Sequence, residues 1–470
     1  MKLKKLLKDL DVEVKGSREV EVTGLSSHSQ FVFPGSLFIA KRGQAFDGTE
    51  FIPKAIETGA VAVLTDFYNP FLQGVVQIIS SDVSRLEALL AQRYYGTEKN
   101  TLYLLGVTGT NGKTTTAYLI HHLLPKCGLM GTIETVIGKQ KFPAQLTTAD
   151  VVTNHKILRE MQEAGLKSAI MEVTSHALDQ NRVEGIPFET AIFTNLSQDH
   201  LDYHGTMGAY LQAKLKLVAQ AKHTVYNADD PAFQGLEGMT YGINTPADLK
   251  AENVAFSLEG TTFDLHYKNR VVSLSSPLIG QYNVYNVLAA FAALLLKGES
   301  LVALQKKLLS FPGIPGRLER VPNERGLNIF VDFAHTPEAL AKVLDTLQSV
   351  KEGRIITIFG CGGERDHGKR PLMAEAAERY SDQVIVTSDN PRGEDPLAIC
   401  QEVATGLKRE ALIEVDRRAA IERGIFMAQK GDTVLIAGRG HEPFQKIGGS
   451  RVPFDDRVVA SQISHLTVES

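Results

Sequence analysis

The stretch Leu102–Leu124, LYLLGVTGTNGKTTTAYLIHHLL, joins an apolar run to a helical pattern through a glycine-rich loop. The apolar run predicts a buried strand, and the residues from Lys113 onward predict a helix. Glycines between them let successive backbone N–H groups face an anion at the helix N-terminus. Lys113 adds a full positive charge, and the Thr114 hydroxyl is suited to ligate Mg²⁺. The stretch therefore predicts a strand, loop and helix that bind the phosphates of ATP.

One position in this loop departs from the generic phosphate-binding spacing. That spacing requires glycine five residues before Gly112, where the chain has Val107. A glycine-rich turn without a ligand is the alternative interpretation. The Lys-Thr pair directly before a helix favours ATP binding. The predicted ATP-binding residues of the loop are Gly109, Thr110, Asn111, Gly112, Lys113, Thr114 and Thr115.

The alternation of apolar strands and helical segments continues along the chain. Apolar runs follow at 168–173, 190–196, 328–334, 354–360, 383–388 and 432–438. Such alternation predicts parallel sheets covered by helices. Upstream of the loop, FVFPGSLFIA and AVAVLTD predict strands and LEALLAQRYYG predicts a helix of a small α/β unit.

We expect an α/β fold of three domains. The length of 470 residues is too great for one compact domain. The turn FPGIPGRLE, which ends near residue 318, marks a boundary, because linkers between domains are rich in proline and glycine. The predicted domains are a small N-terminal domain at 1–98, a central P-loop ATPase-like parallel-sheet domain at 99–317 and a C-terminal Rossmann-like domain at 318–470.

Composition excludes several classes of protein. A formal net charge of -4 gives no basic field for nucleic acid or anionic membranes. The first residues, MKLKKLLKDLDVEV, predict an amphipathic helix and not a signal peptide, and no apolar run approaches the ~20 residues of a membrane span. Three widely spaced cysteines suit a reducing compartment. We expect a cytoplasmic protein that binds neither nucleic acid nor membrane.

Three motifs in order along the chain resemble the Mur ligase family. They are the loop GTNGKT, the segment EVTSH at Glu172–His176 and NLSQDHLD at Asn195–Asp202. The resemblance extends over nearly the whole chain. It implies an ATP-dependent, amide-forming ligase that uses Mg²⁺.

The resemblance also implies which residues act on ATP and Mg²⁺. Lys214, in YLQAK, matches a lysine that related ligases carbamylate with CO2, and Lys216 lies nearby. A carbamate would supply an anionic oxygen, which suits a hard cation better than an ammonium group does. The implied catalytic residues are Lys113, Glu172, His200 and Lys214. The implied metal ligands are Thr114, Glu172, His200 and Lys214 as its carbamate.

Two further groups of residues are implied to complete the nucleotide site. Asn283 and Asn286 match asparagines near the adenine. Arg317, in GRLE, matches a phosphate contact. Asp332 and His335, in DFAHTP, belong to a segment that closes on ATP, where Asp332 would contact the ribose.

The first domain resembles the UDP-binding domain of ligases that add the third peptide residue. The matching segments are LSSH at 25–28, PGSLF at 34–38 and GQAFDG at 43–48. The implied contacts with a UDP-muramoyl-dipeptide are Ser27, Thr147, Thr148, Thr174, Gln180 and Arg182. The two adjacent threonines would equally suit a helix cap.

The segment Asp389-Asn390-Pro391-Arg392 follows the predicted strand at 383–388 and resembles a meso-diaminopimelate recognition motif. Diaminopimelate differs from lysine by a second carboxylate, which a guanidinium group binds in a bidentate manner. Lysine would leave Arg392 unpaired. Other implied acceptor contacts are Arg365, Gly438 and Glu442, while Arg439 replaces a more usual lysine. A plain turn is the alternative interpretation.

The resemblance implies that ATP phosphorylates a substrate carboxylate and that an amine then attacks the acyl phosphate. A lysine-adding ligase, folylpolyglutamate synthase and an ATP-hydrolysing switch are the competing interpretations. Arg392 disfavours the lysine-adding ligase, and residues 1–98 disfavour folylpolyglutamate synthase. The segment Asp389–Arg392 disfavours the switch. The sequence leaves open the arrangement of the domains, the carbamylation of Lys214, the number of Mg²⁺ ions and the strictness against lysine. We expect a monomer.

Overall fold

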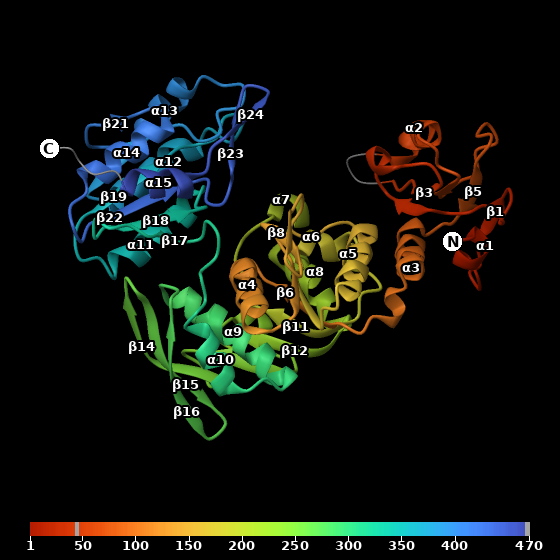
Figure 1. Ribbon diagram of the computed structural model, residues 1–470, viewed down its shortest axis with the longest axis horizontal. Helices are drawn as coiled ribbons and strands as arrows, with labels where there is room; N and C mark the ends of the chain where they lie inside the picture. Colours follow the sequence, from red (N-terminus) through yellow and green to blue (C-terminus); the bar gives the residue numbers. More distant parts are fainter. Residues whose placement is uncertain (43–46, 466–470) are drawn as a thin grey trace. The chain divides into compact units, whose positions relative to one another are not determined.

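The computed structural model describes residues 1–42 and 47–465 (Figure 1). The chain has an α/β fold, as predicted, and it divides into two compact units. The first unit contains Met1–Leu249 and Tyr285–Ser300. The second contains Lys250–Val284 and the chain from Leu301 onward. Each unit is described separately below.

The N-terminal part of the first unit is a five-stranded sheet in the order β1-β5-β4-β3-β2. The last four strands are parallel, and β1 (Glu13–Lys15) is antiparallel to β5. The predicted N-terminal helix covers only α1 (Leu3–Leu6), because the chain then turns into β1. The other elements are β2 (Gly24–Ser26), β3 (Ser36–Ile39), β4 (Ala62–Thr65), β5 (Val76–Ile79), α2 (Ile52–Glu57) and α3 (Val83–Tyr95).

Helix α3 connects this sheet to the central part of the first unit. Asp82 caps its N-terminus, and Gly96 ends it in the left-handed conformation that glycine adopts without strain. The Gln92 side chain donates to the Gly185 carbonyl at 3.2 Å. The helix also packs against α5 (Val151–Glu163).

The central sheet places the phosphate-loop strand β6 (Tyr103–Thr108) between two parallel neighbours, β10 and β11. The order in this unit is β13-β12-β11-β6-β10-β7-β8-β9, and only β8 and β9 are antiparallel. The strand bounds are β7 (Cys127–Met130), β8 (Glu134–Ile137), β9 (Gln140–Pro143), β10 (Ser168–Glu172), β11 (Phe188–Phe193), β12 (Ala221–Asn227) and β13 (Met239–Gly242). The predicted strands at 168–173 and 190–196 are thereby confirmed.

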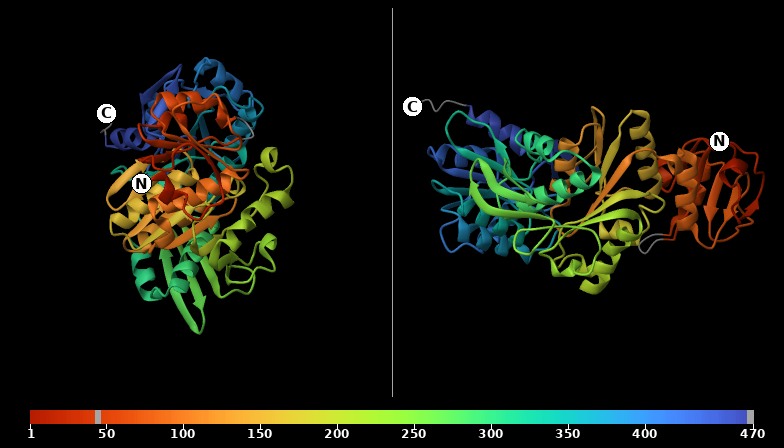
Figure 2. Two further views of the ribbon diagram at one scale, coloured as in Figure 1. Left: turned by 90° about the vertical axis from the view of Figure 1, so that its right-hand side faces the viewer. Right: turned by 90° about the horizontal axis from the view of Figure 1, so that it is seen from below.

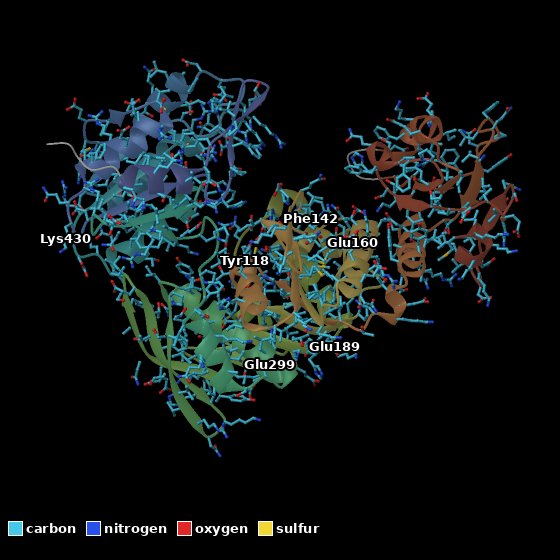
Figure 3. The ribbon with its side chains drawn as sticks, viewed as in Figure 1. Tyr118, Phe142, Glu160, Glu189, Glu299 and Lys430 are labelled. Atoms are coloured by element: carbon cyan, nitrogen blue, oxygen red, sulfur yellow. The ribbon has the colours of Figure 1, made fainter. Side chains whose placement is uncertain are left out.

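Helices lie around the central sheet, and α4 (Lys113–Leu123) begins at the phosphate-loop lysine, as predicted. Tyr118, labelled in Figure 3, donates from α4 to Glu134 of β8 at 3.0 Å. The others are α6 (Ser175–Asp179), α7 (Leu201–His204), α8 (Met207–Ala219) and α9 (Gln281–Lys297), which begins in the second unit.

The second unit begins with strands that the sequence analysis did not anticipate. Strands β14 (Leu249–Ser257), β15 (Gly260–Tyr267) and β16 (Arg270–Ser276) are neighbours in chain order, and they are drawn in green in Figure 2. Helix α10 (Leu301–Leu308) contacts β16.

The C-terminal part is a six-stranded sheet in the order β17-β18-β22-β19-β20-β21. All pairs are parallel except β17 with β18. Its bounds are β17 (Glu319–Val321), β18 (Asn328–Asp332), β19 (Ile355–Phe359), β20 (Gln383–Val386), β21 (Leu412–Ile413) and β22 (Thr433–Ala437). Strands β18, β19, β20 and β22 confirm the four predicted strands of this region.

Two apolar clusters show that helices cover both faces of this sheet. Leu344, Met373 and Ile399 belong to one cluster, and Ile421 and Val459 belong to the other. The helices are α11 (Pro337–Gln348), α12 (Lys369–Tyr380), α13 (Pro396–Ala404), α14 (Arg417–Met427) and α15 (Asp456–Ser464). A hairpin of β23 (Phe444–Ile447) and β24 (Ser450–Pro453) precedes α15. The result is a doubly covered parallel sheet, as a Rossmann-like domain requires.

None of the helices within 1–42 and 47–465 combines the length and apolarity needed to cross a membrane.

Candidate active site

The phosphate loop begins later than the generic spacing requires. Val107, where the generic loop has glycine, is a fully buried residue of β6 and pairs with Glu172 of β10. The loop proper starts at Gly109, whose φ is +148°. A Cβ at Gly109 would lie 1.8 Å from Thr194 Oγ1. The departure at Val107 therefore reflects a longer strand, and Gly109 is the glycine that the loop needs.

Residues from the end of β11 hold the loop in place. The Thr194 hydroxyl donates to the Asn111 carbonyl at 2.6 Å. The Asn195 side chain accepts from Asn111 N at 2.9 Å and donates to the Asn111 carbonyl at 3.0 Å. Thr194 was not assigned a role from the sequence, because a threonine at a strand end has no distinctive pattern.

Lys113 lies over the phosphate loop. Its ammonium group donates to the carbonyls of Gly109 and Thr110, both at 2.9 Å. At the other end of the loop, Asn286 Oδ1 would be 2.3 Å from a Cβ at Gly112. The first unit thus brings Asn286 of α9 to the predicted nucleotide loop.

A buried carboxylate lies beside the first turn of α4. Glu172 is fully buried at the end of β10 and accepts hydrogen bonds from the Thr114 hydroxyl at 2.9 Å and the Thr132 hydroxyl at 3.0 Å. The Thr132 amide donates to its other oxygen at 2.9 Å. A carboxylate and two hydroxyl oxygens are the hard donors that Mg²⁺ prefers, so these residues fit a Mg²⁺ site. Thr132 was missed by the sequence analysis.

The residues predicted to bind the UDP-linked substrate in the central part form one hydrogen-bonded group. Thr148 donates to the Glu172 carbonyl at 2.8 Å and accepts from Thr174 N at 3.1 Å. Arg182 donates to the Thr148 carbonyl at 3.1 Å and to Gln180 Oε1 at 2.6 Å.

Thr147 joins this group to the predicted metal site. Its hydroxyl lies 3.1 Å from that of Thr132, which contacts Glu172. The predicted substrate residues and Glu172 are therefore neighbours.

Lys214 is almost fully buried on α8, whereas Lys216 forms a surface ion pair with Asp179. Lys214 Nζ donates to the Gly109 carbonyl at 2.9 Å and lies 4.4 Å from the Tyr210 ring centroid. Burial, reinforced by the nearby Lys113 charge, lowers the pKa of Lys214 to about 6. A neutral amine at this place is a competent nucleophile for CO2. The structure thus separates the two lysines that the sequence left close together.

His200 lies in a cluster of aromatic rings with His176 and Tyr210. Its φ is +52°, and its ring packs 4.7 Å from that of His176. The His204 ring is hydrogen-bonded to the Ser175 hydroxyl at 3.0 Å and also packs in this cluster. In the part of the chain that the structure describes, no group of three or more His, Cys, Asp or Glu side chains could hold a metal. Thr114 and Glu172 lie together, and the roles of His200 and Lys214 as ligands of the same ion stay predictions.

Ser27 lies in the N-terminal sheet, directly after β2. Glu87 is a buried carboxylate on α3, and burial raises its pKa. Lys41 and the Ser27 hydroxyl act against this rise, because both favour the ionised form. Lys41 Nζ lies 2.5 Å from Glu87. In the predicted segment GQAFDG, residues 43–46 lie outside the described residues.

The remaining predicted nucleotide residues belong to the second unit. Asp332 ends β18 and accepts from Leu318 N and Ala334 N, both at 2.7 Å. Arg317 stacks on the Phe333 ring at 4.8 Å, and the His335 ring is 2.8 Å from the Phe333 carbonyl. Asn283 donates to the Ile279 carbonyl at 2.9 Å.

The predicted acceptor motif directly follows β20, at the carboxyl edge of the C-terminal sheet. Asn390 donates to Glu442 at 2.9 Å, and its oxygen accepts from Arg439 at 3.1 Å. Asp389 is buried, and burial raises its pKa while Arg417 and Arg439 oppose the rise. The motif and Glu442 therefore form one site.

A buried ion pair between Arg417 and Asp456 lies next to the acceptor motif. Arg417 pairs with Asp456 at 2.7 Å, and both side chains have no exposed surface. The guanidinium also donates to the carbonyls of Ser388 and Ala437, which lie at the ends of β20 and β22. Neither Arg417 nor Asp456 was identified from the sequence.

Arg392 adopts the left-handed conformation, with φ of +52°. Its side chain is partly buried and donates to the carbonyls of Gly363 and Asn390. Pro391 is buried, and Arg365 is exposed in the loop after β19. Gly438 has φ of +113°, and a Cβ there would lie 2.7 Å from Asp389. All predicted acceptor residues thus come from the loops that follow β19, β20 and β22.

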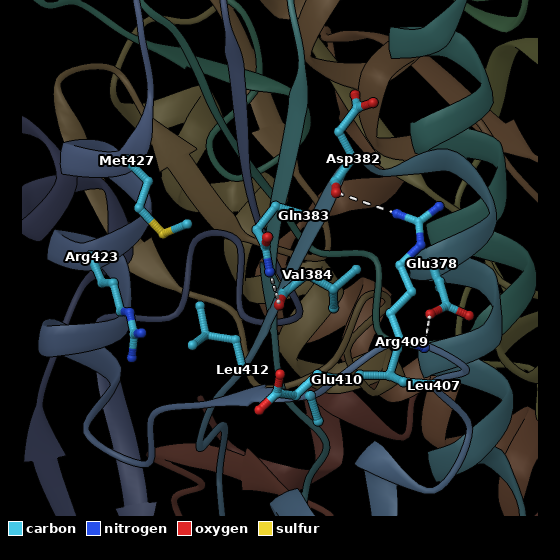
Figure 4. Close-up of a pocket in the computed structure, with 11 residues that line it drawn as sticks. Glu378, Asp382, Gln383, Val384, Leu407, Arg409, Glu410, Leu412, Arg423 and Met427 are labelled. Carbon is cyan, nitrogen blue, oxygen red and sulfur yellow. Dashed lines mark hydrogen bonds between the residues drawn. The ribbon is translucent and has the colours of Figure 1, made fainter.

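A hollow of about 490 Å³ in the C-terminal domain lies at the opposite edge of the sheet (Figure 4). It is lined where β20 begins, by Gln383 and Val384, whereas the acceptor motif follows the end of β20. It does not coincide with the candidate site.

Three family models match the chain in succession. The Mur ligase family catalytic domain matches residues 21–94, the Mur ligase middle domain matches 107–294 and the Mur ligase glutamate ligase domain matches 316–440. The chain therefore belongs to the Mur ligase family, and it is an ATP-dependent, amide-forming ligase.

Curated relatives give a more specific likeness. The chain is 41% identical over 462 residues to the UDP-N-acetylmuramoyl-L-alanyl-D-glutamate–2,6-diaminopimelate ligase of Geobacillus thermodenitrificans, covering 94% of each chain. It is 43% identical over 477 residues to the ligase of the same name from Chlamydia abortus, covering 98% of each.

Solved structures agree with this likeness. One of a UDP-N-acetylmuramoyl-L-alanyl-D-glutamate–2,6-diaminopimelate ligase matches with a TM-score of 0.72 and 34% identity, covering 99% of this chain and 100% of that one. A folylpolyglutamate synthase of Mycobacterium tuberculosis matches with a TM-score of 0.60, 18% identity and coverage of 76% and 92%, which shows a shared fold alone.

Proposed function

We propose that the protein adds meso-diaminopimelate to UDP-N-acetylmuramoyl-L-alanyl-D-glutamate in the synthesis of peptidoglycan precursor. The observation that carries this proposal is the acceptor site after β20, where Arg392, Asn390 and Glu442 lie together. A carboxylate of the acceptor finds a cation in Arg392, and an ammonium group finds an anion in Glu442. The names of the relatives support the same substrates.

The first half of the reaction takes place at the phosphate loop. The γ-phosphoryl group of ATP passes to a carboxylate oxygen of the UDP-linked substrate, and ADP leaves. Both reactants are anionic, so positive charge must gather where they meet. Lys113 supplies one such charge, and Arg182 suits the anionic substrate because it is a cation bonded to Thr148, whose hydroxyl contacts the Glu172 carbonyl.

Mg²⁺ would neutralise charge on the transferring phosphate when it is bound. Thr114 and Glu172 are the residues that would hold it, since both present oxygen atoms at one place. Lys214 would contribute as a carbamate, formed when its neutral amine attacks CO2 and loses a proton. The lowered pKa of Lys214 supports that modification, because the uncharged amine is its reactive form. His200 remains a proposed ligand of the same ion.

The second half of the reaction forms the amide. An uncharged amine of diaminopimelate attacks the acyl carbon, inorganic phosphate leaves, and the nitrogen gives up a proton. Arg392 would bind the distal carboxylate, and Glu442 would bind the distal ammonium. Arg365, Asp389, Pro391 and Gly438 are proposed to shape the same acceptor site. Ser27 is proposed to contact the UDP group.

We retain the three domains at 1–98, 99–317 and 318–470, a cytoplasmic location and a monomer as parts of this proposal. Arg317, the last residue before the proposed boundary at 318, is proposed to contact a phosphate of ATP. Asn283, Asn286, Asp332 and His335 are proposed to contact the nucleotide.

Mass spectrometry of the product tests the function. Purified protein, ATP, Mg²⁺ and the UDP-linked dipeptide are incubated with meso-diaminopimelate. The expected product is the UDP-linked tripeptide, heavier than the dipeptide by one diaminopimelate less one water. Absence of this product with all substrates present would refute the proposal.

A further inference from the structure

Two loops that carry predicted acceptor residues are interlocked in the C-terminal domain. We call residues 360–368, after β19, the first acceptor loop, and residues 387–395, after β20, the second acceptor loop. Gly363 N donates to the Asn390 carbonyl at 3.0 Å, and the Arg392 side chain donates to the Gly363 carbonyl. A Cβ at Gly363 would lie 2.0 Å from the Pro391 carbonyl oxygen. The backbones therefore meet too closely for a side chain between them.

Each acceptor loop contains one non-glycine residue in a strained backbone conformation. Arg392 has φ of +52° and Glu364 has φ of +54°. Residues with a Cβ avoid this region unless surrounding contacts hold them there. Such contacts are present: Glu394 accepts from the Glu364 amide, and Glu364 accepts from Gly393 N at 3.3 Å.

Arg370 holds this arrangement from the first turn of α12. Its side chain is 1% exposed and donates to both oxygens of Glu394, at 3.0 and 2.8 Å. The same guanidinium donates to Glu402 of α13 at 2.5 Å and to the Gly362 carbonyl at 3.5 Å. Arg370 thus connects two helices of the scaffold to both acceptor loops.

The position of Glu394 gives this ion pair a direct consequence for Arg392. Glu394 follows Arg392 by two residues, and Glu394 N donates to the Pro391 carbonyl at 3.0 Å. Glu394, the ion-pair partner of Arg370, therefore closes the short turn that carries Arg392. Loss of the Arg370–Glu394 ion pair would let the backbones of Glu364 and Arg392 leave the left-handed conformation, and the Arg392 guanidinium would move with its backbone.

We propose that Arg370 and Glu394 are positioning residues that set the orientation of Arg392 and thereby the selection of a diamino acid with a second carboxylate. This inference rests on the proposed function. Neither residue touches the reacting atoms in this proposal. Their effect is confined to acceptor binding, because the phosphate loop and Glu172 belong to the other unit.

The test compares three variants and a control variant in steady-state kinetics. Arg370→Met keeps an unbranched apolar stem and removes the guanidinium group, Arg370→Lys restores the positive charge, and Glu394→Gln removes the partner charge. The control is Arg354→Met, because Arg354 also makes a multiple ion pair, with Asp432 at 2.8 Å, at the start of β19 in the same sheet.

Arg370→Met and Glu394→Gln should each raise KM for diaminopimelate about tenfold, because a small misplacement of a binding group weakens binding. The phosphoryl step is not altered, so kcat and KM for ATP should change less than about twofold. The preference for diaminopimelate over lysine should fall by a similar factor. Arg370→Lys should recover part of both, and Arg354→Met should change neither. An unchanged acceptor KM in both Arg370→Met and Glu394→Gln would overturn the proposal, as would an equal loss in the control.

Hydrogen exchange separates this proposal from the function on which it rests. Without substrates, amides of residues 361–366 and 390–395 should exchange faster in Glu394→Gln than in the wild type or Arg354→Met. Unchanged exchange would overturn the positioning role of Arg370 and Glu394 even in an enzyme that adds diaminopimelate. Faster exchange in a protein that makes no tripeptide would instead refute the proposed function and support the positioning role of Arg370 and Glu394. If Arg370→Met does not fold, Glu394→Gln carries both measurements.

Discussion

The phosphate loop and the acceptor site are built in different ways. The predicted phosphate loop consists of five consecutive residues, Gly109–Lys113, and the strand and helix on either side fix their place. The acceptor site instead draws on loops after β19, β20 and β22 and relies on buried charged side chains from α12 and α14. Binding through a local backbone motif tolerates variation in its surroundings, whereas a site built from three loops depends on the residues that hold them.

The largest effect is expected at the phosphate loop. Lys113→Ala should lower kcat by about 1000-fold or more, because the transferring phosphate loses its nearest fixed positive charge. Circular dichroism should show an unchanged fold. Phosphate release near the wild-type rate would exclude the loop from the reaction and remove one side of the comparison.

Lys214→Ala should lower kcat about 100-fold or more, since a missing ligand leaves the metal poorly placed. A small carboxylic acid added at high concentration should restore part of the rate by replacing the carbamate. The matched control is Lys216→Ala, which removes only a surface ion pair and should retain full activity. Equal activity of the two variants would contradict the role given to Lys214.

At the acceptor site, Arg392→Ala should lower kcat/KM for diaminopimelate about 100-fold and leave that for lysine nearly unchanged, because only diaminopimelate has a carboxylate for this side chain. ATP binding, measured by calorimetry, should stay as in the wild type. Equal losses with both amino acids would assign Arg392 a structural role and not one in selection.

The smallest effect is expected in stability, where pH acts on α5 at its contact with the turn that follows α3. Burial lowers the pKa of His155 to about 4. Its ring lies 2.6 Å from Thr97 Oγ1 and 3.2 Å from the Glu184 carbonyl. A lowered folded-state pKa means that the neutral ring stabilises the fold above pH ~6.5 and that this stability is lost as pH falls toward 4.

The free energy of unfolding of the wild type, and with it the thermal midpoint, should therefore fall as the pH is lowered from ~6.5 to ~4. His155→Gln should fall less steeply over the same range. Parallel curves for the two proteins would show that His155 does not titrate with folding.

The comparison also explains what the sequence predicted. Strand β6, helix α4, the central strands β10 and β11 and the C-terminal strands β18, β19, β20 and β22 were predicted because their signals are local and periodic. Lys214 and Glu172 were identified by family resemblance, and their burial agrees with roles in a site. Thr132, Thr194, Arg370 and Arg417 escaped because each acts through contacts with residues distant in the chain. Strands β14, β15 and β16 also escaped, because exposed residues alternate with buried ones in them and leave no continuous apolar run.

The central claim is that ATP is consumed only to join a carboxylate to a diamino acid with two carboxylates. Phosphate release by the purified protein with ATP, Mg²⁺ and the UDP-linked dipeptide tests it directly, with meso-diaminopimelate, L-lysine or no acceptor. Turnover with diaminopimelate, and little with lysine or without acceptor, is the predicted result. Equal turnover with lysine would contradict the role of Arg392, and acceptor-independent release would contradict the ligase reaction itself.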